Sequence, residues 1–238
     1  MTRFLKIAAL AAIAQFGTPA TAELIAWEEL IDQDAQVYED PYLGIEYDQL
    51  EDLRTVAMET ARLDADGLSD EERTASALKL EQARSELADA GIDADWLISQ
   101  RWVVAERRER AATSANPDVD GKTVTLAGFA IPAPPEDDGT NVVYIVPERG
   151  MCSHMPPPNA NQMVRVRLGM EWTPEMMHQP VRLTGKLSIA PSEHVFTIVD
   201  GPVRMQASLK MDAHDVQTLG SFSSRTPSIN ITPHSTSN

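Results

Sequence analysis

The hydrophobic period of this chain changes from helical to alternating near residues 116–117. Before this point, between residues 46 and 110, apolar residues recur at the spacing of helices that bury one face. From Gly121 onward, apolar and polar residues alternate over short runs, as in strands that bury one face of a sheet. The change of period predicts an α+β chain built from a helical region and a separate β domain.

Three helices are predicted in the first part. They cover residues 46–62 and 70–90, and a third begins near residues 92–93 and ends in a basic run. Ser69 supplies an N-terminal cap for the second helix, and three acidic residues follow it at the positive end of the helix dipole. Because the intervening turns are short, residues 23–115 are expected to form a helical hairpin or small bundle.

Five or six short strands are predicted in the second part. They cover residues 122–129, 141–146, 163–168, 181–188 and 194–199, with a candidate sixth at 204–207. Such strands predict a small antiparallel β-barrel over residues 118–216. Gly128 and Gly185 fall inside strands, where barrels bend or backbones approach closely, so an OB-like barrel is the expected form. The tail at residues 221–238 is rich in Ser, Thr and Asn and is predicted to be disordered.

The N-terminus has the order of residues found in a secretory signal peptide. Arg3 and Lys6 precede an apolar run, and the small residues at 20–22 follow it. We expect cleavage after Ala22 and export to the periplasm, with secretion to the medium as the second choice. The apolar run is too short to span a bilayer and no later run is longer, so no membrane span is expected after cleavage.

The charge of the chain limits the partners it can bind. Loss of residues 1–22 leaves 18 basic residues against 36 acidic ones, a formal net charge of −18. This acidity repels phosphate backbones, so nucleic acid is not an expected partner, whereas a cation or a basic protein is suitable. A single cysteine cannot form an internal disulfide, so Cys152 is a free thiol, a metal ligand or an intermolecular link.

Most of the chemically specialised side chains lie in the segment 150–162. There, Cys152 and His154 are separated by one residue, so in an extended segment both project to the same side. A thiolate and an imidazole suit zinc or copper, and zinc is preferred, but a site needs at least one more donor. The available soft or imidazole donors are Met151, Met155, Met170, Met176, Met177, His178, His194 and His214.

Two other interpretations of this segment stay open. In one, the thiol is buried, the histidine fixes a loop, and the prolines at 156–158 dock a transporter subunit or another envelope protein. In the other, His154 or another histidine activates Cys152 for thiol catalysis, and Asn161 or Gln162 orients the imidazole or donates to an oxyanion. A base two residues from its nucleophile on one strand points beside it, and no nucleotide loop or nucleophile elbow is present. We therefore expect a protein that is not an enzyme.

Methionine and tryptophan residues outside this segment are interpreted as packing groups. The cluster at residues 176–178 is expected to lie in a core or a helical turn, because methionine more often fills gaps than binds metal. The tryptophans are expected to act as packing anchors, with Trp27 holding the mature N-terminus against the barrel. The four are Trp27, Trp96, Trp102 and Trp172.

The motif resembles the hallmark of DUF3299, an exported bacterial family of unknown function. The residues that carry the resemblance are Gly150, Cys152, His154, Pro156, Pro157, Pro158, Asn161 and Gln162. The resemblance covers residues 118–216 and includes an Asp-Gly-Lys opening a strand that ends in Gly-Phe; Asn159 and Ala160 depart from it by replacing further prolines. It implies a secreted barrel domain. Members often lie beside transport components, including zinc-linked systems, which implies an accessory role in metal transport.

Overall fold

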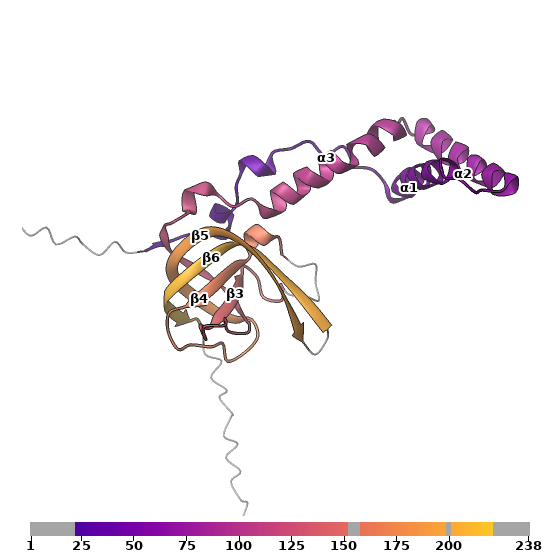
Figure 1. Cartoon of the computed structure of the whole chain (residues 1–238). Coiled ribbons are helices and arrows are strands. Elements are labelled where there is room, and N and C mark those ends of the chain that lie inside the picture. Colours follow the sequence, from indigo (N-terminus) through magenta and orange to yellow (C-terminus); the bar gives the residue numbers. More distant parts are fainter. Residues whose placement is uncertain (1–21, 152–157, 199–200, 221–238) are drawn as a thin grey trace, which may run out of the picture.

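The protein has a mixed α+β fold. The structure is a computed structural model that describes residues 22–151, 158–198 and 201–220. Within these ranges it contains three α-helices and one six-stranded sheet, and Figure 1 shows the helices projecting as an arm from the curled sheet. The elements follow the order β1 (Glu23–Leu24), α1 (Tyr47–Leu63), α2 (Asp70–Asp89), α3 (Ala94–Thr113), β2 (Thr123–Pro132), β3 (Val142–Val146), β4 (Val164–Leu168), β5 (Gln179–Ile198) and β6 (Gly201–Thr218).

The three helices form the predicted hairpin with its own small core. Leu53 and Val56 of α1 pack against Ala83 and Leu87 of α2 and against Leu97 of α3. The helix α3 continues to Thr113, beyond the predicted end in the basic run. Arginine and glutamate are good helix formers, so the basic run continues the helix, and Arg108 in it binds Asp40 at 2.7 Å. None of the described helices is long and apolar enough to cross a membrane.

The helical arm is inserted into the β domain rather than preceding it, which corrects the predicted order. Strand β1 comes before the helices and pairs in parallel with β2, Glu23 opposite Val124. Trp27 donates an Nε1–H hydrogen bond of 2.7 Å to the carbonyl oxygen of Ala127, and Leu30 is fully buried in the core of the sheet. The prediction that Trp27 anchors the N-terminal segment is confirmed.

The sheet pairs in the order β1-β2-β3-β4-β6-β5, and β5 also pairs with β2. The pairings among β2 to β6 therefore return to their starting strand, with β4 and β6 parallel and the others antiparallel. The arrangement is not a regular closed barrel, because β1 and β3 share one edge of β2. Residues 124–125 of that edge pair with β1, and only residues 129–132 pair with β3.

Strands β5 and β6 are longer than predicted. The single strand β5 replaces two predicted strands, and β6 extends the candidate strand 204–207 in both directions. The pairing register shifts between Ile189 and Ser192, which is a bulge that redirects β5 instead of ending it. The distal halves of the two strands, residues 189–198 and 201–208, form a two-stranded extension that leaves the sheet (Figure 1). We call this extension the β-ribbon.

The β-ribbon gives the domain a second core on the outside of the sheet. All five residues of β3 are buried, because Val143 and Ile145 face the inner core while Tyr144 and Val146 face a cluster that includes Met205 of the ribbon. The sequence alternation predicted only one buried face. A strand covered on both faces needs a second layer, and here the ribbon provides it.

Two glycines and two tryptophans test the packing predictions. A Cβ on Gly185 would lie 2.5 Å from the carbonyl oxygen of Asp212, and one on Gly128 would lie 2.7 Å from that of Val146, so the predicted close approach of backbones is present. The packing prediction is wrong for Trp96 and Trp102, which are 51% and 72% exposed on α3. The buried residues of α3 are Ala94, Leu97, Val104 and Ala111, which share one face of the helix, and both tryptophans lie off that face.

Candidate functional site

The sequence motif lies partly outside the described residues. Cys152, His154, Pro156 and Pro157 fall there, whereas Gly150, Pro158, Asn161 and Gln162 are described. Gly150 has a φ of 92°, a left-handed conformation that glycine adopts without strain. Next to it, Met151 packs against the cluster between β3 and the β-ribbon. The motif therefore begins beside the outer core of the β domain.

Asn161 fastens the end of the motif to the helical arm. It lies in the 3₁₀ helix Ala160–Gln162 and is 1% exposed. Its Nδ2 donates hydrogen bonds of 2.8 Å to the carbonyl oxygen of Ala111 and 3.0 Å to that of Ser114. These carbonyls lie at the C-terminal end of α3, where the helix itself supplies no donors. Asn161 thus has a structural role in joining two parts of the fold.

His178 has the most unusual environment among the predicted donors. It is 9% exposed and has a φ of 57°, the one positive φ outside glycine in the described ranges. Burial lowers the pKa of its imidazole, and the positive charge of Arg149 lowers it further. Because Arg149 directly precedes Gly150, His178 lies within electrostatic reach of the motif's N-terminal flank. Its Nε2 is buried without a hydrogen-bond partner in the described structure.

Among the other predicted donors, Met155 lies outside the described residues, and several of those that are described are less suited to a shared site. Met176 and Met177 are exposed in a bend and turn, so of the two expected places, a core or a helical turn, the core is wrong for both. His194 lies on the β-ribbon, and His214 is exposed on β6. Within residues 22–151, 158–198 and 201–220, no group of three or more His, Cys, Asp or Glu side chains is arranged to hold a metal ion.

A groove beside the β-ribbon was not predicted from the sequence. Its volume is about 510 Å³, and its described lining consists of Pro134, Pro135, Glu136, Asp137, Asp138, Val142, Arg165, His194 and Phe196. The signal available in the sequence was the pair of prolines before three acidic residues, which by itself indicates no more than a turn or loop. The groove combines this loop with β4 and the ribbon, and the ribbon itself was not predicted.

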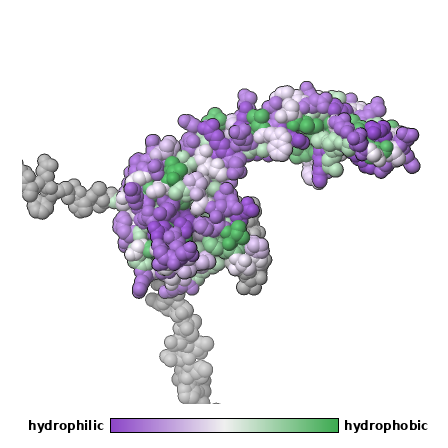
Figure 2. Space-filling model, viewed as in Figure 1, coloured by the Kyte–Doolittle hydropathy of each residue, from purple (hydrophilic) through white to green (hydrophobic). Residues whose placement is uncertain are grey.

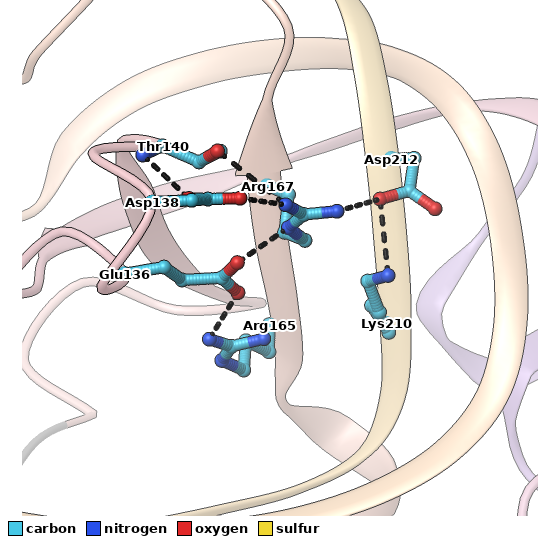
Figure 3. A network of polar contacts seen from close by, with 7 residues as sticks. All are labelled: Glu136, Asp138, Thr140, Arg165, Arg167, Lys210 and Asp212. Carbon is cyan, nitrogen blue, oxygen red and sulfur yellow. Dashed lines mark hydrogen bonds and ion pairs between the residues drawn. The ribbon is translucent and has the colours of Figure 1, made fainter.

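An ion-pair network joins Glu136, Asp138 and Arg165, which line the groove, and Figure 3 shows its contacts. Arg165 and Arg167 of β4 both donate to Glu136, at 2.5 and 2.8 Å, and Arg167 also contacts Asp138 at 3.1 Å. The hydrogen bond from the Thr140 hydroxyl is the main cause that lowers the pKa of Asp138. Charge-assisted bonds of this kind hold the loop between β2 and β3 against the sheet.

Among the comparisons with known proteins, the family model assigns this chain to a family. No curated protein matches the chain significantly. A crystal structure of a DUF3299 family protein from Pseudomonas aeruginosa PAO1 is 23% identical, with a TM-score of 0.35 over 45% of this chain and 68% of that one. The family model described as "Protein of unknown function (DUF3299)" matches residues 27–218, a range that includes the helical arm. The chain therefore belongs to the DUF3299 family, as its motif predicted.

Proposed function

We propose that this protein is an exported periplasmic accessory protein that binds a transition metal ion, zinc in preference to copper, through Cys152 and His154. The signal-peptide order of its N-terminus supports export. A formal net charge of −16 for the whole chain favours binding of cations over anions. A thiolate and an imidazole two residues apart supply the ligand types that zinc sites use.

The observation that carries the proposal is the orphaned nitrogen of His178. The described residues contain nine buried side-chain polar atoms without a partner, and among them only this one belongs to an imidazole, the common ligand of zinc. Here the atom is Nε2 of an imidazole on a strained backbone, near Arg149 at the start of the motif. Backbone strain of this kind is retained where the surroundings demand a particular side-chain position. His178 in its neutral form suits the third donor that the motif needs.

The strand pairings support an OB-like barrel as the frame of this site. Strands β2 to β6 form a ring of five pairings with one parallel pair, which resembles the five-stranded, partly open barrel of OB-folds. The shared edge of β2 and the long β-ribbon are the departures from that form. Because this fold serves many functions, the strand pairings support the expected fold but are no argument for metal binding.

The second candidate function is a protein-interaction module, favoured by the exposed tryptophans of the helical arm. Figure 2 shows apolar surface among polar groups along the arm, and Trp96 and Trp102 are largely exposed there. Large aromatic side chains are frequent in protein interfaces, so this surface suits docking to a transporter subunit or another envelope protein. In that case Cys152 is a buried structural thiol and no metal is bound.

Zinc titration of the purified protein in competition with a chromophoric chelator tests the proposal. We expect one zinc ion per chain and a loss of affinity of more than about tenfold in His178→Asn, because even outer-shell partners contribute that much. Asparagine tolerates a positive φ, so this substitution preserves the backbone. His214→Asn removes an exposed imidazole and serves as the matched control, with circular dichroism confirming that both variants fold.

Each outcome of the titration decides between the candidates. Equal zinc affinity in the parent and in His178→Asn would remove His178 from the site. Failure of the parent protein to bind zinc or copper would overturn the metal proposal and favour the interaction module. A rapid, pH-dependent alkylation of Cys152 without metal binding would instead indicate a reactive thiol, as in a thiol-dependent enzyme.

A further inference from the structure

The groove beside the β-ribbon has the dimensions and rigidity of a small-ligand site. Its volume of about 510 Å³ lies within the range of roughly 300–1,000 Å³ that such sites occupy. The ring of Phe196 packs edge-on against Tyr144 at 6.1 Å between centroids, and the ring of His194 lies parallel to that of Phe196 at 6.0 Å. These contacts hold both ribbon side chains in place before any ligand binds, which lowers the entropic cost of binding.

The charged groups of the groove are compensated by one another. Glu136 is bound by both arginines of β4, and Asp138 is bound by Arg167. Among the carboxylates that line the groove, Asp137 alone has no ion-pair partner in the described structure. A polyanionic ligand would be repelled by the three carboxylates that line the groove. A polycationic ligand would have to compete with Arg165 and Arg167 for Glu136. A neutral ligand avoids both costs.

The lining offers a neutral ligand two kinds of contact. Pro134, Pro135, Val142 and Phe196 provide apolar surface, whereas Asp137, Arg165 and His194 provide hydrogen-bonding groups. A sugar matches this combination, because each hydroxyl both donates and accepts hydrogen bonds while the C–H face of the ring packs on aromatic and proline carbons. Few other neutral ligands present so many hydroxyls beside an apolar face.

The position of the groove within the fold agrees with this chemistry. OB-fold barrels bind ligands on the face of their second and third strands, between the loops that follow the first and the fourth, and their ligands are oligonucleotides and oligosaccharides. In this chain those parts correspond to β3 and β4, the loop of residues 133–141 and the β-ribbon. Strong negative charge excludes the oligonucleotide.

We infer that the groove between the residue 133–141 loop, β4 and the β-ribbon binds a neutral oligosaccharide. The inference rests on the OB-like frame of the proposed function but not on the metal, because no lining residue belongs to the motif. A chain that binds sugar without zinc, or zinc without sugar, therefore separates the two proposals.

Isothermal titration of the purified full chain with neutral tetrasaccharides tests the inference. The probes are the tetramer of N-acetylglucosamine, cellotetraose and maltotetraose, with tetralysine as the cationic comparison. We expect at least one sugar to bind. We expect His194→Ala to weaken the affinity for that sugar by about tenfold. Glu193→Ala is the matched control, because adjacent strand residues point to opposite faces and Glu193 pairs with Arg204 at 3.3 Å outside the groove.

His194→Ala could weaken binding by disturbing the ribbon itself, so a second variant, Asp137→Ala, changes the groove at a position outside the ribbon. The side chain of Asp137 is exposed in a loop, so removing its carboxylate leaves the core intact. We expect this variant to weaken the affinity for the same sugar. Sugar binding that both groove variants keep at full strength would overturn the inference, as would the absence of binding to all three sugars. Binding of tetralysine alone would also overturn it and would identify the groove as a cation site.

Discussion

The side-chain amide of Asn161 donates a hydrogen bond of 2.8 Å to the main-chain carbonyl of Ala111. A second bond from the same nitrogen reaches Ser114, and Ser208 of β6 donates to the carbonyl oxygen of Thr113 at 2.5 Å. Three carbonyls at or just beyond the end of α3 are therefore satisfied by side chains of the β domain. The attachment of the helical arm thus depends on a residue of the family motif.

Asn161→Ala should destabilise the protein by about 1–3 kcal/mol, because it removes two hydrogen bonds between the β domain and α3, although Gln36 still donates to Ala111 and the backbone of Asp32 to Ser114. Urea unfolding measures this loss, and hydrogen exchange should localise the added fraying to the last turn of α3. Gln162→Ala, in the same 3₁₀ helix, is the control and should have little effect. Equal stability of Asn161→Ala and the parent would contradict the structural role given to this amide.

Gly185→Ala should destabilise the β domain by about 1–3 kcal/mol, because the added methyl group meets backbone rather than a flexible side chain. A Cβ there would lie 2.5 Å from the carbonyl oxygen of Asp212 and 2.7 Å from Cα of Ala213. Thermal unfolding followed by circular dichroism gives the change. Gly169→Ala, whose nearest contact would be 3.2 Å, should cost less. The reverse order would argue against the observed approach of β5 and β6.

Leu30→Ala should destabilise the β domain by about 2–5 kcal/mol, although Leu30 precedes the helical arm in sequence. The side chain is fully buried in the inner core beside Val124 and Leu126, so its loss leaves a cavity. Val37→Ala, at a position that is 84% exposed, is the control. If both variants unfold at the parent's urea concentration, the N-terminal segment is not part of the core.

Thr140→Val should raise the pKa of Asp138 toward its ordinary value of 3.8, because the Thr140 hydroxyl is the main cause of the lowered pKa. A carboxyl with a lowered pKa stabilises the folded state above pH 3.8, and this contribution is lost as the pH falls through the lowered value. An NMR titration of the Asp138 carboxyl carbon measures the shift. An identical titration curve in Thr140→Val would assign the effect to Arg167 and the backbone instead.

The sequence predicted the elements that depend on local pattern. The helices at 47–63 and 70–89 follow from their apolar spacing and from the cap at Ser69, whose Oγ accepts a hydrogen bond from the backbone of Glu72. The strand cores at 142–146 and 164–168 follow from apolar runs or alternation. These signals need no knowledge of which distant residues meet.

The features that sequence reasoning missed depend on long-range contacts. The pairing of Glu23 with Val124 joins residues on either side of the helical arm, and a two-residue strand leaves no periodic signal. The β-ribbon was predicted as separate strands because Pro191 interrupts the alternation, yet the bulge carries β5 past it. The groove was missed for the same reason, since His194 and Arg165 line one groove only when the ribbon packs against β3.

The metal content of the purified mature protein tests the central claim most directly. Mass spectrometry of the parent chain should find close to one zinc ion per chain, lost in both Cys152→Ser and His154→Ala while their circular dichroism spectra stay unchanged. The loss follows because zinc sites need their thiolate and imidazole ligands in place. A parent chain that is free of metal and takes up neither added zinc nor added copper would contradict the account.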